Sequence, residues 1–181
     1  HGLAGLYFND TAKIDVQRLR IRNFTRAGIE LYTASGEQNV YISFSQCMLE
    51  YNGEHVLTSG INTANNLISC KDCQFIASVV GHAIHFSNGV IGWLFTSCDF
   101  SNSKTSDVFT QYAVNLSFIN CYREWNGVTS PAFMEAATYG SSVPVSGLVI
   151  QGCYLGGESD PCGSAIVLGM TDGANHSEVF G

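Results

Sequence analysis

The sequence has little charge, little proline and no long apolar run. Only 13% of its 181 residues are charged, and it contains 3 prolines. No run approaches the roughly 18 apolar residues that a membrane span requires, and no charged segment followed by an apolar core marks a signal peptide. No stretch repeats apolar residues at the i, i+3, i+4 spacing of an amphipathic helix. We therefore expect neither membrane insertion nor a helical fold.

Positive charge is especially scarce. Eight Lys and Arg stand against 15 Asp and Glu, which gives a net charge of −7. The only basic cluster comprises Arg18, Arg20, Arg22 and Arg26, and its members alternate along one face of an expected strand. Such a pattern is typical of a solvated strand face rather than of a nucleic-acid interface. We expect no nucleic-acid partner.

What the sequence does contain is a repeated frame, seen in residues 65–75, NNLISCKDCQF. Apolar residues alternate through Ile68 and Cys70, two polar residues follow, and the alternation resumes at Cys73 and Phe75. The frame returns five times, once without cysteine. If the equivalent residues are Phe24, Cys47, Cys73, Cys98, Cys121 and Cys153, the steps are 23, 26, 25, 23 and 32 residues. A period in this range indicates a solenoid.

A second apolar position recurs within each repeat. Its members are Ile29, Val56, Ile84, Val108, Phe133 and Ile166. Because the alternation runs over only four to six residues at a time, both positions lie on short strands. The 19 glycines and 45% hydrophobic residues fit a turn-rich all-β protein. We predict a single parallel β-helix domain, residues 1–181, of about six to seven coils. The repeat frame starts and ends midway through a coil, so we expect an excerpt of a longer chain.

The 7 cysteines fit this fold as buried side chains. Five share one repeat position, and Cys70 occupies another inward one. Stacked coils lie about 4.8 Å apart, beyond the usual disulfide Cβ separation of about 3.5–4.5 Å, so we expect free thiols and folding in a reducing compartment. The alternative is zinc at the CxxC of Cys70 and Cys73, but no second CxxC or paired histidine completes a site. We expect no metal and no cofactor.

The repeated frame, with Asn, Asp or Ser before the column residue at Asn23, Asp72, Ser97 and Asn120, resembles a known family. It is similar to the right-handed parallel β-helix of the pectate-lyase-like superfamily, most of all to bacteriophage tailspike domains. The resemblance covers about residues 4–181. It implies a right-handed coil, a homotrimer, and binding and frequent cleavage of bacterial surface polysaccharides. It also implies a place in the virion tail, after assembly in the host cytoplasm. The paired-Asp, Gly-His-Gly and Arg-x-Lys signatures of polygalacturonases are absent.

The outward positions just after the cysteine column align acids with aromatic residues. By the repeat, Asp99, Tyr122 and Tyr154 form one exposed ridge, with Glu124 beside it. Aromatic surfaces beside carboxylates suit a sugar, which offers both C–H faces and hydroxyls. The candidate glycan-binding residues are Tyr122, Arg123, Trp125 and Tyr154, and the candidate catalytic carboxyls are Glu124, Asp99 and Glu135. The alternative is that the exposed aromatic rings pack over the base of a neighbouring loop and bind no ligand.

The direction of three further side chains, those of Glu135, His82 and His85, bears on whether they could act chemically. Glu135 follows inward Phe133 by two positions, so alternation would turn its carboxyl inward and raise its pKa, as a general acid requires. Alternatively the strand has already ended and Glu135 is solvated. His82 and His85, three apart on a strand, are expected on opposite faces without a shared metal, with His85 pointing outward.

A second outward column suggests an interface. It comprises Leu57, His85, Phe109, Met134 and Val167. Such a mostly apolar stripe is expected to be covered, either by a neighbouring subunit in a threefold arrangement or by a loop of the same chain.

The sequence, together with the family resemblance, favours a tailspike-like β-helix that binds a bacterial surface polysaccharide. If the ridge is also catalytic, the protein cleaves the glycosidic bonds of that polysaccharide. The alternative is a non-catalytic structural or adhesive shaft segment of a virion fibre or surface adhesin.

Overall fold

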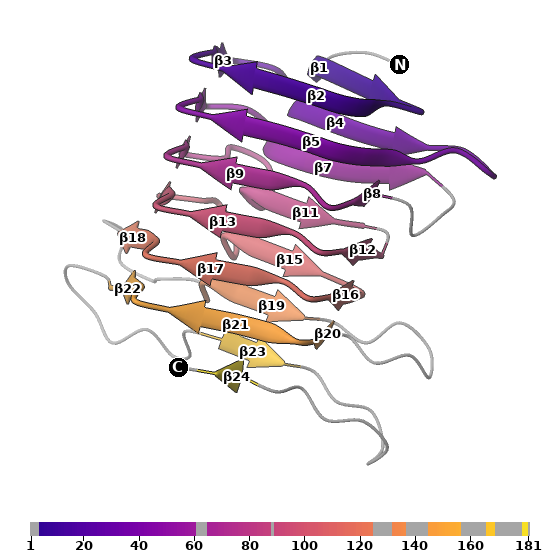
Figure 1. Ribbon diagram of the computed structural model, residues 1–181. Helices are drawn as coiled ribbons and strands as arrows, with labels where there is room; N and C mark the ends of the chain where they lie inside the picture. The colour runs from indigo at the N-terminus through magenta and orange to yellow at the C-terminus, as the bar shows by residue number, and fades with distance from the viewer. Residues whose placement is uncertain are drawn as a thin grey trace.

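The computed structural model is an all-β parallel solenoid of about five turns (Figure 1). It describes residues 4–60, 65–87, 89–124, 132–136, 145–156, 166–168 and 179–180. None of these residues lies in a helix, and the described part of the chain therefore has no helix that could span a membrane. The parallel β-helix is therefore confirmed, with fewer turns than the six to seven coils that the repeat predicts.

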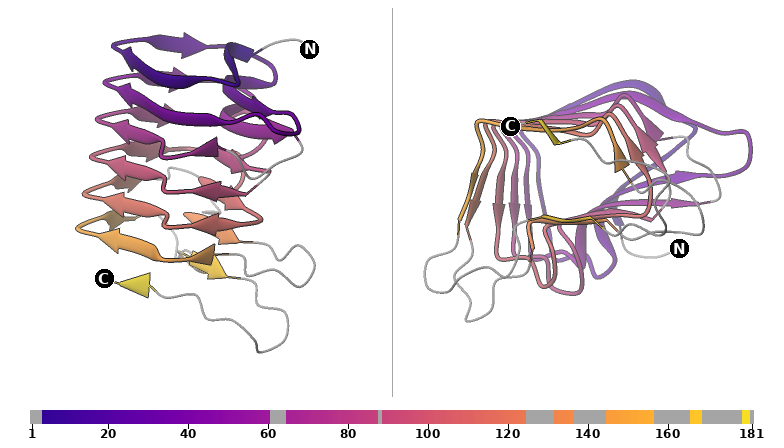
Figure 2. Two further views of the ribbon diagram at one scale, coloured as in Figure 1. Left: turned by 45° about the vertical axis from the view of Figure 1, so that its right-hand side comes forward. Right: turned by 90° about the horizontal axis from the view of Figure 1, so that it is seen from below.

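Three parallel sheets form the walls of the solenoid, and the end-on view in Figure 2 shows them enclosing one interior. Sheet A contains β1 (Ala4–Asn9), β4 (Ala27–Thr33), β7 (Glu54–Gly60), β11 (Ile84–Phe86), β15 (Val108–Thr110), β19 (Met134–Ala136) and β23 (Ile166–Leu168). Sheet C contains β3 (Arg20–Arg22), β6 (Met48–Glu50), β10 (Gln74–Ile76), β14 (Asp99–Ser101), β18 (Tyr122–Glu124) and β22 (Tyr154–Leu155).

Sheet B is the widest wall. Its long strands are β2 (Ala12–Gln17) and β5 (Asn39–Ser45). In later coils this wall is divided into β8 (Asn65–Asn66) with β9 (Ser69–Lys71), β12 (Val90–Ile91) with β13 (Leu94–Thr96), β16 (Ala113–Val114) with β17 (Ser117–Ile119), and β20 (Val145–Ser146) with β21 (Leu148–Gln151). The last strand is β24 (Val179–Phe180). Each coil runs through sheets B, C and A in turn.

The register of sheet A confirms most of the second apolar column. Ile29, Val56, Ile84 and Val108 are direct partners on successive strands. The next member is Met134, which pairs with Val108 and Ile166, and not Phe133 as predicted. Phe133 is buried just before β19 begins. Since side-chain direction alternates along a strand, this shift of one residue exchanges the inward and outward residues of β19.

The cysteine column is confirmed, but its first member is Leu19 rather than Phe24. Arg20 pairs with Met48, which places Leu19 beside Cys47. Cys47, Cys73, Cys98 and Cys121 are buried, and Cys153 is half-buried. Each thiol donates to a backbone carbonyl of the preceding coil, as Cys98 Sγ does to Cys70 O at 3.4 Å. The six described cysteines are unpaired, and burial raises the pKa values of Cys47, Cys70 and Cys153.

A left-handed residue makes each corner between sheets B and C. This corner column comprises Arg18, Gln46, Asp72, Ser97, Asn120 and Gly152, all with φ between 52° and 63°. Each N–H up to Asn120 donates to a carbonyl of the next coil, for example Ser97 N to Ile119 O at 2.9 Å. The αL conformation costs roughly 1–2 kcal/mol for a residue with a Cβ, so the coil-to-coil hydrogen bonds hold these residues in place.

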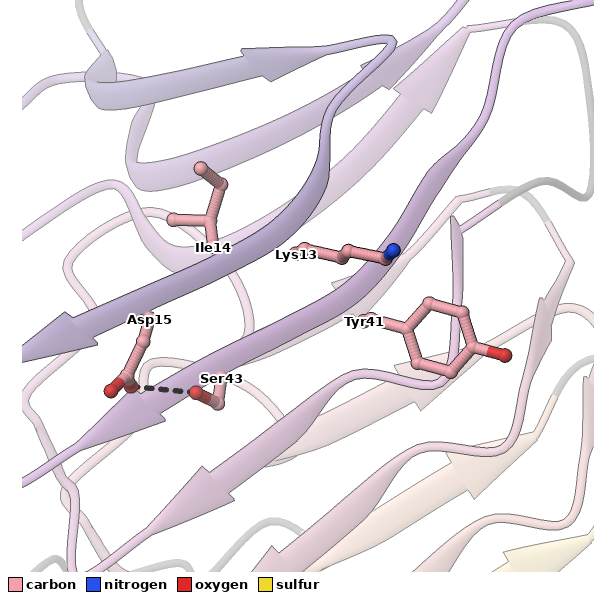
Figure 3. A pocket seen from close by; sticks show the side chains of 5 residues that line it. All are labelled: Lys13, Ile14, Asp15, Tyr41 and Ser43. Atoms are coloured by element: carbon pink, nitrogen blue, oxygen red, sulfur yellow. Dashed lines mark hydrogen bonds between the residues drawn. The ribbon is translucent and has the colours of Figure 1, made fainter.

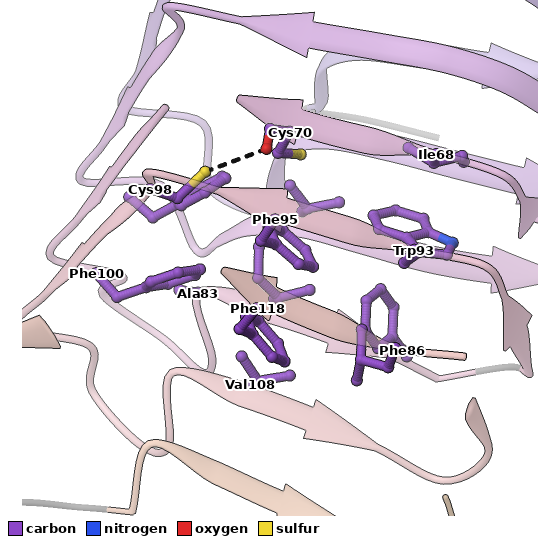
Figure 4. Close-up of a cluster of buried hydrophobic side chains, with 14 of the residues drawn as sticks. Ile68, Cys70, Ala83, Phe86, Trp93, Phe95, Cys98, Phe100, Val108 and Phe118 are labelled. Atoms are coloured by element: carbon purple, nitrogen blue, oxygen red, sulfur yellow. Dashed lines mark hydrogen bonds between the residues drawn. The ribbon is translucent and has the colours of Figure 1, made fainter. Parts of the chain in front are cut away.

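Columns of aromatic rings fill the interior (Figure 4). Phe95 and Phe118 are stacked, with ring centroids 5.0 Å apart and planes 8° apart. Phe100 packs edge-on against both rings, and Trp93 lies between Phe86 and Phe95. Cys70 occupies the Phe44 and Phe95 column, as predicted. Because identical positions stack at the coil spacing, the interior is a rigid base for the side chains on the outer faces.

Candidate functional site

The ridge predicted on sheet C is present. Asp99, Tyr122 and Tyr154 are direct partners on β14, β18 and β22. Tyr122 is 42% exposed and Tyr154 is 58% exposed. Their rings are stacked, with centroids 5.1 Å apart and planes 12° apart. We call Asp99, Tyr122, Glu124 and Tyr154 the sheet C ridge.

Two carboxyl groups flank these rings. Tyr122 Oη donates to Glu124 Oε2 at 3.2 Å, and Ser101 Oγ donates to Asp99 Oδ1 at 2.9 Å. Burial raises the pKa of Asp99; the Ser101 hydroxyl opposes this shift, and the charge of Glu124 adds to it. Asp99 therefore keeps its proton to a higher pH than an exposed aspartate does.

Arg123 does not lie on the ridge. Its partners in the neighbouring strands are Phe100 and Leu155, so its side chain points into the solenoid. The guanidinium Nε donates to Asp107 Oδ2 at 2.8 Å, and both side chains are 1% exposed. The structure thus contradicts the expectation of Arg123 as a glycan contact, because alternation turns it inward between Tyr122 and Glu124.

Glu135 is not part of the ridge either. It lies on sheet A, opposite Phe109 and Val167, in the outward column. We expected side chains to alternate from an inward Phe133, which would turn Glu135 inward. Met134 is instead the inward residue of β19, so Glu135 points outward. The inward interpretation of Glu135 was therefore wrong. Trp125 lies outside the described residues.

A second polar cluster, which the sequence did not reveal, lies where sheet C turns into sheet A. His85 Nδ1 lies 2.6 Å from Glu54 Oε1. The rings of His82 and His85 meet edge to face, with centroids 5.3 Å apart, whereas we expected opposite faces. His82 precedes β11 at the corner, where strand alternation does not yet hold. No local signal marks that corner.

A shallow pocket lies on the outer face of sheet B, away from both clusters (Figure 3). It is lined by Lys13, Ile14, Asp15, Tyr41 and Ser43 from β2 and β5. Ser43 Oγ donates to Asp15 Oδ1 at 2.6 Å. The open surface and the single held carboxylate offer no group for chemistry, so we assign it no role.

The described residues contain no group of three or more His, Cys, Asp or Glu arranged to hold a metal ion. No family model, no curated protein and no solved structure matches the chain. Arguments about function therefore depend on the geometry of the two clusters.

Proposed function

We propose that the chain is a tailspike-like β-helix that binds a bacterial surface polysaccharide along the sheet C ridge, as part of a virion tail protein. The observation that carries this proposal is the exposed stack of Tyr122 on Tyr154, flanked by the carboxyls of Asp99 and Glu124. The ridge combines aromatic area with acceptors for hydroxyls, and this combination suits a neutral sugar chain.

The stack also determines how a sugar chain meets the ridge. Since the Tyr122 and Tyr154 rings cover each other's faces, a chain running along the solenoid contacts their edges and phenol oxygens. Successive coils are about 4.8 Å apart, so Asp99 to Tyr154 spans roughly 10 Å, or about two sugar rings. The carboxylates then accept hydrogen bonds from the hydroxyls of those rings.

Alanine substitutions of the two tyrosines test the proposal. Tyr122→Ala and Tyr154→Ala should each weaken binding of the host polysaccharide about tenfold, which corresponds to about 1.4 kcal/mol. The matched control is Tyr41→Ala, because Tyr41 is 59% exposed but lies on sheet B. Titration calorimetry gives the affinities. Equal affinities for all four proteins would show that the ridge does not bind the glycan.

Cleavage of the glycosidic bond is the second candidate, favoured by the raised pKa of Asp99 next to Glu124. A protonated carboxyl beside an ionised one is the arrangement that glycoside hydrolysis uses. Asp99→Asn and Glu124→Gln should each lower the release of reducing ends about 10²–10⁴-fold with binding retained. Glu135→Gln on sheet A is the control. If all three variants release reducing ends at the wild-type rate, this pair is not catalytic.

The proposed homotrimer requires a different surface from the expected stripe. On sheet A, Leu57 is buried and Met134 points inward. Ile14, Tyr41 and Leu94 are exposed apolar residues of sheet B, and Leu67 is exposed in the bend between β8 and β9. Light scattering should show a trimer that dissociates when Leu67 and Leu94 are both replaced by Asp. If the wild-type protein is a monomer and neither binds nor cleaves the polysaccharide, the alternative is favoured, namely a non-catalytic shaft segment.

A further inference from the structure

The corner between sheets C and A carries a row of polar groups that extends over three successive coils. Glu54 begins β7, His82 and His85 belong to the next coil, and Thr105 with Ser106 precedes β15 in the coil after that. Hydrogen bonds or ring contacts join each group to the next. The row is therefore a continuous cluster that runs from the partly exposed Glu54, His82 and His85 to the buried Ser106.

The centre of this row is a carboxylate-oriented imidazole. A carboxylate can only accept, so the 2.6 Å contact with Glu54 Oε1 places the proton on His85 Nδ1. The lone pair of the neutral ring is then on Nε2. The side chains of His85 and Glu54 are 25% and 15% exposed, so small molecules can reach them. This is the arrangement of an oriented general base.

Neighbouring rings hold His85 in this orientation. Phe109 packs at 90° to it, with centroids 5.2 Å apart, and His82 stacks on Phe109 with centroids 4.8 Å apart. His82 Nδ1 lies 2.8 Å from Ser106 Oγ and 2.9 Å from Thr105 Oγ1. Burial lowers the pKa of His82, and the charge of His85 lowers it further. His82 is thus a neutral positioning residue.

We propose that Glu54 and His85 form a second active site, separate from the sheet C ridge, which hydrolyses a neutral carboxylic ester. His85 Nε2 takes a proton from water as the water oxygen attacks the acyl carbon. The tetrahedral intermediate then collapses, the C–O bond to the alkoxy group breaks, and His85 returns the proton to the leaving oxygen. Acid and alcohol are the products, with no other reactant consumed.

Local charge favours a neutral ester over an anionic substrate. The charged group in contact with His85 is the Glu54 carboxylate, which repels a phosphate or a uronate. Arg26, in the coil before Glu54, is already paired with Glu30 at 2.8 Å. Glycosidic cleavage is less suited to this site, because it calls for two carboxyls across the bond.

The hydrolysis of p-nitrophenyl acetate by the whole chain tests this proposal without any sugar. We expect His85→Ala to lower kcat/KM about 10²–10⁴-fold. Glu54→Gln should lower kcat and leave KM unchanged, because a neutral amide orients the imidazole less strongly than the carboxylate does. A purely structural role for Glu54 would not lower kcat while leaving KM unchanged.

Tyr41→Ala is the control for unspecific surface chemistry, because Tyr41 lies on sheet B, and it should hydrolyse the ester at the wild-type rate. Melting temperatures identify variants that fail to fold; His85→Gln then replaces His85→Ala. A wild-type rate no higher than that of free imidazole, or a His85 variant within twofold of wild type, overturns the proposal. Neither result bears on glycan binding by Tyr122 and Tyr154.

Discussion

Arg123 and Asp107 form an ion pair inside the solenoid, directly behind the exposed ridge. Arg123 Nε donates to Asp107 Oδ2 at 2.8 Å, and Ser103 Oγ donates to the other carboxylate oxygen at 2.6 Å. Tyr122 and Glu124, on either side of Arg123 in β18, point outward. The pair therefore anchors the strand that carries half of the ridge.

The first prediction concerns this pair. Asp107→Asn removes the negative charge that faces the buried Arg123 guanidinium, and we expect the free energy of unfolding to fall by roughly 3–5 kcal/mol. The double variant Arg123→Leu with Asp107→Asn removes both charges, and Leu matches Leu155 in the same column. It should be more stable than Asp107→Asn alone in urea unfolding. A double variant that is less stable than the single one would contradict a coupled pair.

The second prediction concerns the thiol column. Cys98→Ser places a hydroxyl in an apolar slot, with a side chain too short to reach Cys70 O as the thiol does at 3.4 Å. We expect a loss of roughly 1–3 kcal/mol, measured by urea unfolding. Cys98→Ala, which adds no polar group, is the control and should cost less. Rapid labelling of five or more thiols in the native protein would be incompatible with the column.

The third prediction is a pH dependence of stability that comes from His55. This side chain is fully buried, and burial lowers its pKa to about 3, although a backbone hydrogen bond at Ile76 opposes the shift. The unfolded chain has a histidine pKa of about 6.5, so it binds the proton more readily than the folded chain. The stabilisation is therefore complete above about pH 6.5 and is lost as the pH falls towards 3, by roughly 4 kcal/mol.

His55→Leu tests this dependence, because Asn52 Nδ2 keeps its bond to Ile21 O at 3.1 Å when the imidazole is removed. Urea unfolding at a series of pH values should show a flatter profile for the variant between pH 6.5 and 3. His82→Leu, at a partly exposed site, is the matched control and should retain most of the slope. Parallel profiles for wild type and His55→Leu would show that other groups cause the acid sensitivity.

The fourth prediction concerns the corner after sheet C. Ala77 has φ of 56°, and its N–H donates to Ser101 O at 2.7 Å. Because αL is strained for alanine and free for glycine, Ala77→Gly should raise the free energy of unfolding by up to about 1 kcal/mol. Asn102→Gly at the equivalent corner is the control, since asparagine tolerates αL, and should change less. Destabilisation by Ala77→Gly in thermal melts would contradict this geometry.

The sequence alone determined the parallel coil and most of its columns. Alternation with period two, repeated every 23 to 32 residues, leaves few other ways to bury Ile84, Cys98 and Phe118 together. It also placed Asp99, Tyr122 and Tyr154 in line, because equivalent residues of parallel coils must stack.

The tertiary structure decided what happens at the corners. There a left-handed residue interrupts the alternation of side chains. The sequence pattern therefore predicted Phe24 instead of Leu19 as the first member of the cysteine column, and Phe133 instead of Met134 in the inward column of sheet A. The same limit concealed the meeting of His82 with His85, because their directions depend on backbone turns that no side-chain pattern records. A strand's period fixes which residues share a face, while only the packed coils fix where each strand begins.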